Sequence, residues 1–495
     1  MQSFSQKIMS AEEAAEWIQH GEVLGISGFT LSGYPKAVPE ALAKKAMNMH
    51  AKGEEFKVSV FSGASTGDDC DGVLARAGAI QMRMPYQSNP FLRKAINEGH
   101  VQYIDAHLSV MAPMVRSRAL PKPSTALIEC IAVTPEGRVY LSASGGNSTT
   151  YLECADQIIL EINAIYNEEY IGIHDTFIAA LPPFARAIPI QKVCDRVGKP
   201  YVQVDPKKIK AIVYTESHDR VQSFEEPDAT SKHIAFRILD FINHEQKKGR
   251  LPAGLAYQSG VGNVANAVLC EMASDPRLNK INLYTEVIQE AVIPLLEANK
   301  LGFASGTALT LSVEAQKHLK SNISQWKNHF ILRQQEISNH PEVIRRLGII
   351  SMNTALEMDI FGNVNSSHVN GSSIMNGIGG SADYARSCYL GFFMTPSVAK
   401  GGTLSTIVPM VSHVDHTDHD TMIFVTEQGL ADLRALDPMG KAKRVIENCA
   451  HPDFRPELLS FLKFHEKQQK KGRLPIDLQH AFDMHIRAID SNSMI

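Results

Sequence analysis

Residues 255–272 have the sequence LAYQSGVGNVANAVLCEM, which predicts a strand, a tight turn at Ser259–Asn263 and a helix in direct succession. Gly260, Gly262 and Ala265 fit the pattern G-x-G-x-x-A. Such a loop presents backbone N–H groups at a helix N-terminus, where a phosphate or another anion binds well. The stretch therefore predicts an α/β fold with an anion-binding turn.

The next segment, INLYTEVIQEAVIPLLEANK at residues 281–300, predicts a short strand followed by a helix that begins directly after Glu286. Open α/β sheets usually bind ligands at such a strand end. The residues alone leave three interpretations open. Glu286 belongs to a plain turn and is stabilised by the helix dipole, or it holds the ribose of a dinucleotide, or it is the nucleophile of an acyl-transfer site.

Short apolar runs alternate with helical stretches along the rest of the chain, which favours parallel α/β sheets. We predict strands at residues 22–29, 57–61, 125–133, 157–163 and 210–214. Helices are predicted after a capping box formed by Ser10 and Glu13, at residues 36–53, and at residues 232–249. The polar segment 215–232 lacks apolar periodicity. We therefore place a boundary there, which divides the 495 residues into domains 1–220 and 221–495.

Composition excludes several classes of protein. Hydrophobic residues make up 44% and charged residues 21%, which is an ordinary globular balance. A net charge of −4 gives no long-range attraction to nucleic acid or to an anionic membrane, and no apolar run is long enough for a bilayer span. The seven cysteines are scattered without a CxxC pair, which indicates reduced thiols. We expect a cytoplasmic protein with no nucleic-acid or membrane partner.

Several further segments occur in one order along the chain: RQQEISNHPEVIRRLGII (333–350), NTALEMDIFGNVNSSH (353–368), MNGIGGSADYARS (375–387), VPMVSHVDHTDHD (408–420) and TEQGLADLR (426–434). Together with GISGFTLSGYPKAVPEAL (25–42), the glycine loop and LYTEVIQE, this ordered set closely resembles the acetyl-CoA hydrolase/transferase family. The resemblance implies two CoA-transferase-type open α/β domains with the active site between them, usually in a homodimer. It also implies CoA transfer that involves succinyl-CoA or propionyl-CoA with acetate or succinate.

The resemblance assigns roles residue by residue. Glu286 is the expected nucleophile, Asn339 and Gly380 the expected oxyanion donors, and Glu427 a carboxylate beside the active glutamate. The expected CoA contacts are Val261, Gly262, Asn263, Val264, Ala265, Leu356 through its backbone, Asn376, Gly380 and Lys400. Taken alone, each of the following residues also fits a purely structural role. Asn339 would cap the following helix, GIGG would be a simple loop, Lys400 a solvated charge and Glu427 a polar residue at a strand end.

The alternatives to a transferase are an acyl-CoA hydrolase, an NAD-dependent dehydrogenase and a non-catalytic acyl-CoA-binding protein. The expected chemistry needs no metal, nucleotide or redox cofactor, because CoA is both the substrate and the covalent intermediate. The segment HVDHTDHD at residues 413–420 carries residue types that suit zinc or manganese. Its spacing matches no closed zinc site, so we predict a structural or site-lining loop and no metal.

Overall fold

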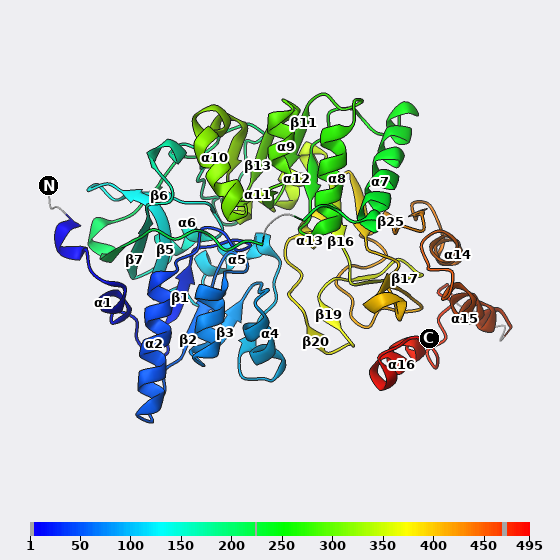
Figure 1. Cartoon of the computed structure of the whole chain (residues 1–495), viewed down its shortest axis with the longest axis horizontal. Coiled ribbons are helices and arrows are strands. Elements are labelled where there is room, and N and C mark those ends of the chain that lie inside the picture. Colours follow the sequence, from blue (N-terminus) through cyan, green and yellow to red (C-terminus); the bar gives the residue numbers. More distant parts are fainter. Residues whose placement is uncertain (1–3, 223–224, 468–472) are drawn as a thin grey trace. The chain divides into compact units, whose positions relative to one another are not determined.

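The computed structural model describes residues 4–222, 225–467 and 473–495. The chain divides into two compact units. Unit 1 contains the described residues of Met1–Phe224 together with Ile281–Leu347, and unit 2 contains the described residues of Glu225–Lys280 and Gly348–Ile495. Figure 1 shows that helices flank the strands in each unit, so the predicted α/β class is confirmed.

Unit 1 is built on a mostly parallel sheet. Neighbouring strands follow the order β4 (Gln102–Tyr103), β3 (Ile80–Met84), β2 (Val58–Phe61), β1 (Val23–Ile26), β5 (Thr125–Val133), β7 (Gln157–Asn163) and β9 (Ile209–Thr215). Two antiparallel strands, β6 (Arg138–Leu141) and β8 (Val202–Gln203), extend it beside β5. Helices cover both faces of such a sheet, which explains the nearly continuous apolar runs in β5 and β7.

Helix α2 (Ala37–Ala51) packs its apolar face on this sheet, where Val38, Leu42 and Ala46 join Leu24 and Val58 in one core. Figure 1 shows α2 in dark blue beside β1 and β2. Among residues 4–222, the other α-helices are α1 (Ala11–Ala15), α3 (Val73–Arg76), α4 (Pro90–Asn97), α5 (Leu108–Arg116) and α6 (Ser148–Cys154). The capping box predicted at α1 is confirmed, since both of its hydrogen bonds are present.

A buried charge network lies just before α2. The Lys36 Nζ is 2.6 Å from Glu129 Oε2 and 2.9 Å from Asp219 Oδ1, and all three side chains are almost fully buried. Ser142 Oγ and Asn163 Nδ2 also donate to Glu129. Although burial opposes a charged ammonium, the two carboxylates outweigh it and raise the pKa of Lys36. The ammonium is therefore the counter-ion of two carboxylates inside the core.

The second stretch of unit 1 contains β11 (Ile281–Tyr284), β12 (Val287–Gln289), α9 (Val292–Glu297), β13 (Leu301–Gly306), β14 (Ala308–Thr310), α10 (Val313–Trp326), β15 (Phe330–Leu332), α11 (Gln335–Ser338) and α12 (Pro341–Leu347). Within it, β13 lies between β11 and β15, and all three strands are parallel. The division predicted from the sequence differs here, because it assigned this stretch to the second domain. Buried ion pairs from Arg116 to Glu336 and from Asp175 to Arg333 join it to the first stretch.

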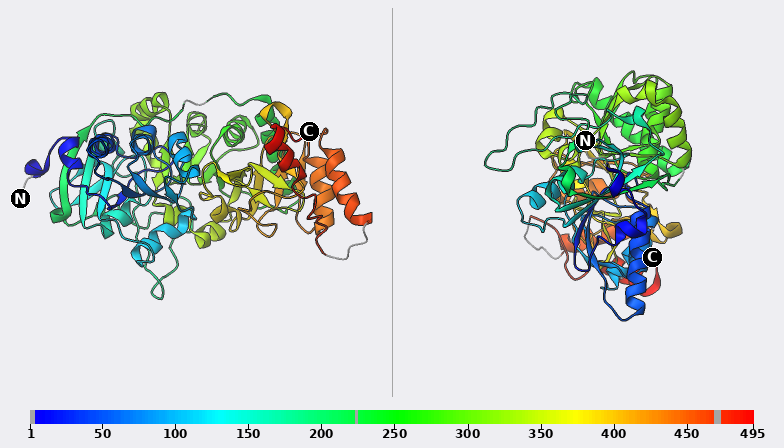
Figure 2. Two further views of the ribbon diagram at one scale, coloured as in Figure 1. Left: turned by 90° about the horizontal axis from the view of Figure 1, so that it is seen from below. Right: turned by 90° about the vertical axis from the view of Figure 1, so that its left-hand side faces the viewer.

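Unit 2 contains the parallel strands β10 (Tyr257–Ser259), β16 (Ile350–Thr354), β21 (Leu390–Met394) and β25 (Ile423–Val425), with β26 (Leu430–Asp432) antiparallel at the edge. Helices α7 (Ala229–Lys247) and α8 (Asn263–Ser274) precede and follow β10. Figure 2 shows α14 (Pro438–Asn448), α15 (Arg455–Lys467) and α16 (Asp483–Ser491) gathered together, from orange to red. Their apolar faces share one core with β21, β25 and β26.

Most predicted elements are confirmed to within a few residues, including β5, β7, α2 and α7. Part of the predicted boundary, residues 223 and 224, lies outside the described residues. All seven cysteines are free thiols. Among the described residues, no helix combines the length and the apolar character that crossing a bilayer requires.

His174 makes the stability of unit 1 sensitive to acid. Burial lowers the pKa of His174 from 6.5 to about 4, and its Nε2 lies 2.7 Å from Ser142 O. Below pH 6.5 the His174 side chain is protonated in the unfolded chain, but in the folded protein it stays neutral until the pH approaches 4. The free energy of unfolding therefore falls as the pH drops towards 4. Between pH 7 and pH 5 we expect this group to remove about 2 kcal/mol of unfolding free energy, as urea titrations at both pH values will measure.

The variant His174→Gln keeps a side-chain N–H for Ser142 O but does not titrate. Between pH 7 and pH 5 we expect this variant to lose about 2 kcal/mol less unfolding free energy than the unmodified protein loses. Equal losses in the two proteins would show that His174 is not the source of the acid sensitivity.

Candidate active site

Glu286 lies in unit 1, in the short break between β11 and β12. The strands that pair with them, β13 and β14, are separated by a similar break. The carbonyl oxygen of Glu286 accepts hydrogen bonds from Thr307 N at 2.7 Å and Ala308 N at 3.3 Å. Just before it, Thr285 N donates to Ser305 O at 2.9 Å. The backbone of Glu286 is thus fixed on the neighbouring strands, while its side chain is only half-buried.

The sequence predicted a helix directly after Glu286, and this prediction is wrong. Val287–Gln289 forms β12, which pairs in parallel with β14, and α9 begins only at Val292. β-branched Val287 and Ile288 fit a pleated strand well, and Pro294 falls in the first turn of α9, where a missing N–H costs little. The strand pairing, which local propensity does not reveal, holds the residue after Glu286 in an extended conformation.

Asn339 contacts Glu286 directly. It ends α11, its side chain is fully buried, and its Nδ2 donates to Glu286 Oε1 at 2.8 Å. The amide is therefore aimed at the glutamate, so the alternative of a simple helix cap does not account for its orientation. These two residues were predicted to act together although they are separated by 53 positions.

Sequence reasoning missed the residues that hold α11 in place. Arg116 donates to both carboxylate oxygens of Glu336, at 2.7 and 2.6 Å, and both side chains are more than nine-tenths buried. Tyr284 Oη donates to Ile337 O at 2.8 Å. Bidentate, desolvated pairs of this kind fix orientation as well as position. No local sequence pattern indicates this pair, because Arg116 lies 220 positions before Glu336.

The glycine loop lies in unit 2 and has the predicted strand–turn–helix form. Gly262 precedes the first residue of α8 with φ of 118°, a conformation that favours glycine, and Asn266 N begins the helical bonding at Gly262 O. Val264 and Ala265 are buried, so their side chains face the core, whereas Val261 is 49% exposed. A ligand would therefore meet Val261 and the backbone N–H groups of the first helical turn.

The other residues assigned to CoA are also in unit 2. Leu356 N donates to Asn365 O at 2.9 Å, so a ligand contact through its backbone would use the carbonyl. Asn376 Oδ1 accepts from Gly377 N at 2.8 Å, and Gly380 immediately precedes α13 (Ser381–Ala385). Lys400 is exposed between the short antiparallel strands β22 (Val398–Ala399) and β23 (Leu404–Ser405), where a long cation can reach a phosphate.

Glu427 follows β25 in unit 2, and its carboxylate is held as an anion. Ser397 donates to it through both its amide, at 2.8 Å, and its hydroxyl, and Gln428 Nε2 donates at 3.1 Å. Burial raises the pKa of Glu427, but these hydrogen bonds outweigh burial and the net pKa is lowered. The side chain is thus a firmly positioned negative charge.

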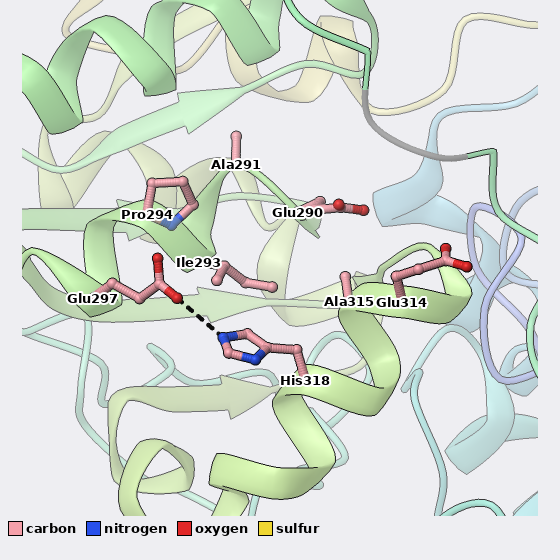
Figure 3. Close-up of a pocket in the computed structure, with 8 residues that line it drawn as sticks. All are labelled: Glu290, Ala291, Ile293, Pro294, Glu297, Glu314, Ala315 and His318. Atoms are coloured by element: carbon pink, nitrogen blue, oxygen red, sulfur yellow. Dashed lines mark hydrogen bonds and ion pairs between the residues drawn. The ribbon is translucent and has the colours of Figure 1, made fainter.

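A pocket of about 300 Å³ lies between α9 and α10 in unit 1, only four residues after Glu286 (Figure 3). Its lining includes the carboxylates of Glu290, Glu297 and Glu314, and His318 Nε2 lies 3.0 Å from Glu297 Oε1. A concentration of carboxylates repels the phosphates of CoA. None of the residues assigned to CoA lines this pocket, so we do not place the substrate there.

Comparison with known proteins agrees with the resemblance seen in the sequence. Residues 1–214 match the acetyl-CoA hydrolase/transferase N-terminal domain, and residues 316–461 match the C-terminal domain of the same family. The chain is 46% identical to succinyl-CoA:acetate CoA-transferase of Clostridium kluyveri, over 99% of this chain and 90% of that protein. It is 42% identical to propanoyl-CoA:succinate CoA transferase of Escherichia coli, over 98% of each. Acetyl-CoA hydrolase of Schizosaccharomyces pombe is 39% identical, over 99% and 96%.

Solved structures share the fold at lower identity. RipA from Yersinia pestis superimposes with a TM-score of 0.72 at 22% identity, over 94% of this chain and 98% of that chain. A 4-hydroxybutyrate CoA-transferase from Porphyromonas gingivalis gives a TM-score of 0.62 at 17% identity, with the same coverage. The domain matches and the closely related sequences agree across nearly the whole chain. The chain is an enzyme of the acetyl-CoA hydrolase/transferase family.

Proposed function

We propose that this enzyme transfers CoA between small carboxylic acids, with Glu286 as the covalent carrier. The observation that carries the proposal is the 2.8 Å hydrogen bond from the buried Asn339 amide to the Glu286 carboxylate. In a chain of this family, a half-buried carboxylate with a fixed amide donor beside it has the components of nucleophilic catalysis. We assign CoA binding to the loop Val261–Ala265 and to Leu356, Asn376 and Lys400, on the strength of the family resemblance.

The proposed reaction proceeds through two kinds of covalent intermediate. A Glu286 carboxylate oxygen attacks the thioester carbonyl of the acyl-CoA. The CoA thiolate departs, and an acyl–glutamyl anhydride remains on the enzyme. The thiolate then attacks the glutamyl carbonyl, which releases the first acid and leaves a glutamyl–CoA thioester. A second carboxylate reverses both steps and departs as the new acyl-CoA. Each step forms a tetrahedral oxyanion, which Asn339 Nδ2 and Gly380 N–H are proposed to stabilise.

Replacement of Asn339 by alanine tests the amide. Because one fixed oxyanion donor contributes roughly 10²–10³ in rate, we expect Asn339→Ala to lower kcat by that factor while the KM for acyl-CoA changes little. Asn322→Ala is a matched control, because Asn322 is partly exposed on α10 and its Nδ2 donates to His318 O within the same helix. Steady-state kinetics would refute the role if Asn339→Ala kept more than a third of the normal kcat.

The covalent intermediate can be detected directly. The protein is incubated with succinyl-CoA or acetyl-CoA without an acceptor acid, and its intact mass is measured. We expect the mass of CoA to be added, on a peptide that contains Glu286. Borohydride, which reduces a thioester, should then inactivate the enzyme. An unmodified protein that still transfers CoA would overturn the proposal.

Acyl-CoA hydrolysis is the second candidate, because relatives that are 36–39% identical are named acetyl-CoA hydrolases. Water would intercept the anhydride or the thioester if it reached either one. Assays of free thiol from acetyl-CoA distinguish the two activities. A transferase releases no net thiol and needs an acceptor acid, whereas a hydrolase releases thiol without one. The dehydrogenase alternative has no counterpart among the relatives named here.

Succinate is the proposed first acid, and acetate or propionate the proposed second, because the two most similar relatives named here act on these acids. A panel of acyl-CoA donors and acceptor acids tests this pair. We further propose a homodimer, which sedimentation velocity will test. The seven free thiols support a reducing compartment such as the cytoplasm. No resident cofactor is proposed, since CoA is both substrate and intermediate.

A further inference from the structure

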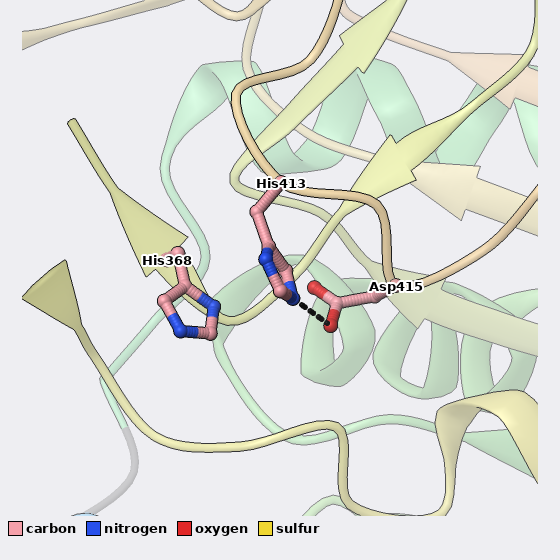
Figure 4. A group of neighbouring side chains, drawn as sticks. All are labelled: His368, His413 and Asp415. Carbon is pink, nitrogen blue, oxygen red and sulfur yellow. Dashed lines mark ion pairs between the residues drawn. The ribbon is translucent and has the colours of Figure 1, made fainter. Parts of the chain in front are cut away.

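We propose that His368, His413 and Asp415 form a binding site for a divalent transition-metal ion, best probed with Zn²⁺. The three side chains converge in unit 2, where one candidate ligand atom from each lies within 4.8 Å of the others. Figure 4 shows the two imidazoles side by side, with the carboxylate next to His413. The sequence indicated residues 413–420 as the segment with metal-ligand residue types. It did not indicate His368 as a ligand, because this residue lies in β19 (His368–Val369), far earlier in the chain.

The donor set has the chemistry that such an ion selects. Two imidazoles and one carboxylate suit zinc, and three protein ligands leave a position for water. Zinc bonds of about 2.0–2.1 Å place tetrahedral ligands roughly 3.4 Å apart. His413 Nε2 and Asp415 Oδ1 are 3.3 Å apart, close to this spacing, and the ligand atom of His368 lies within 4.8 Å of both.

Outer hydrogen bonds already orient two of the three groups. Ser366 N donates to Asp415 Oδ2 at 2.7 Å, and Ser367 Oγ donates to the same oxygen at 2.7 Å. Ser367 Oγ is also 2.8 Å from His368 Nδ1, so one hydroxyl links the carboxylate and the imidazole. Partners of this kind fix the ring tautomer and the ligand direction in metal sites.

The two histidine rings lie directly against each other. Their centroids are 3.8 Å apart with an interplanar angle of 37°. Neutral imidazole is the form that binds a metal. A bound ion would be coordinated by one nitrogen from each of the two rings, His368 and His413.

The proposed ion would join β19 to the segment that leads to His416. His416 Nε2 lies 3.1 Å from Ser381 Oγ, and Ser381 directly follows Gly380. The proposed catalytic chemistry does not use the ion, so we assign it a role in fixing this segment. Hydrogen exchange of residues 364–369 and 411–417 should therefore slow when Zn²⁺ is added.

The test uses the full chain after chelator treatment and dialysis. Zn²⁺ is titrated by calorimetry, and Co²⁺ is added in parallel because its visible absorption reports nitrogen and oxygen ligands. We expect one site, and at least about a tenfold loss of affinity in His413→Ala. His413 is partly exposed, so this variant should fold, and its circular dichroism and apo melting temperature verify that.

His419→Ala is the matched control, because His419 belongs to the same segment but has a 77% exposed side chain and pairs with Asp418. Its affinity should equal that of the unmodified protein. His368→Ala provides a second ligand variant from a different strand and should weaken binding as His413→Ala does. Absence of Zn²⁺ binding, or equal affinity in His413→Ala and His419→Ala, would overturn the site. Either result leaves the proposed CoA transfer unaffected, because CoA transfer is assayed separately.

Discussion

Replacement of Glu286 by glutamine should lower CoA transfer by roughly 10⁴-fold or more, the order of loss seen when a covalent nucleophile is removed. An amide does not attack a thioester, so neither the anhydride nor the glutamyl–CoA thioester can form. The substitution is nearly isosteric, and its amide oxygen can still accept the hydrogen bond from Asn339 Nδ2. The chain should therefore fold normally, and intact mass after incubation with succinyl-CoA should show no added CoA.

Glu290→Gln is the control for this experiment. Glu290 lies in the same segment and accepts from Ser312 N at 3.2 Å, a bond that a glutamine oxygen also accepts. It lines the pocket between α9 and α10, where we place no substrate. Its activity should stay within about twofold of normal. Full transferase activity in Glu286→Gln would exclude Glu286 as the carrier, whatever the control shows.

Lys36→Met should lower the unfolding free energy by about 3–5 kcal/mol, the usual cost of removing one partner from a buried ion pair. The substitution keeps the apolar stem but removes the positive charge between Glu129 and Asp219. Both carboxylates would then remain buried without their counter-ion. Urea unfolding followed by fluorescence measures the loss. Acid should partly reverse it, because protonation of the carboxylates removes the uncompensated charge.

Lys94→Met provides the comparison, since Lys94 is 72% exposed and lies 3.8 Å from Glu98 on the surface of α4. Exposed pairs of this kind contribute about 0–1 kcal/mol. A second variant, Lys36→Met with Glu129→Gln and Asp219→Asn, should regain much of the lost stability. If Lys36→Met were no less stable than Lys94→Met, the buried network would not have the energetic role inferred here.

Local pattern was sufficient to predict the main strands and helices but not their partners. The runs in β5 and β7 are apolar enough to identify buried strands, and the Ser10–Glu13 capping box identified the start of α1. Val287–Gln289 failed as a predicted helix because its conformation depends on pairing with β14, more than twenty residues later. The grouping of Ile281–Leu347 with residues 4–222 depends in the same way on distant partners.

The candidate site shows the same limit. The residues around Glu286 left three chemical interpretations open, and only the ordered set of family motifs chose among them. The family motifs also indicated Asn339, whose amide does point at Glu286. No pattern indicated that Arg116 supports α11 or that His368 approaches His413, because each contact joins distant segments. Long-range side-chain contacts are decided by packing, which a single sequence does not display.

The Arg116–Glu336 pair also has a consequence for synthesis on the ribosome. The two residues are 220 positions apart, so at about 5–20 residues per second Arg116 emerges roughly 10–45 seconds before its partner. During that interval a side chain destined for the interior must remain hydrated. The part of unit 1 that precedes residue 222 therefore cannot complete the core around Arg116 until α11 has been made, and faster elongation shortens this interval.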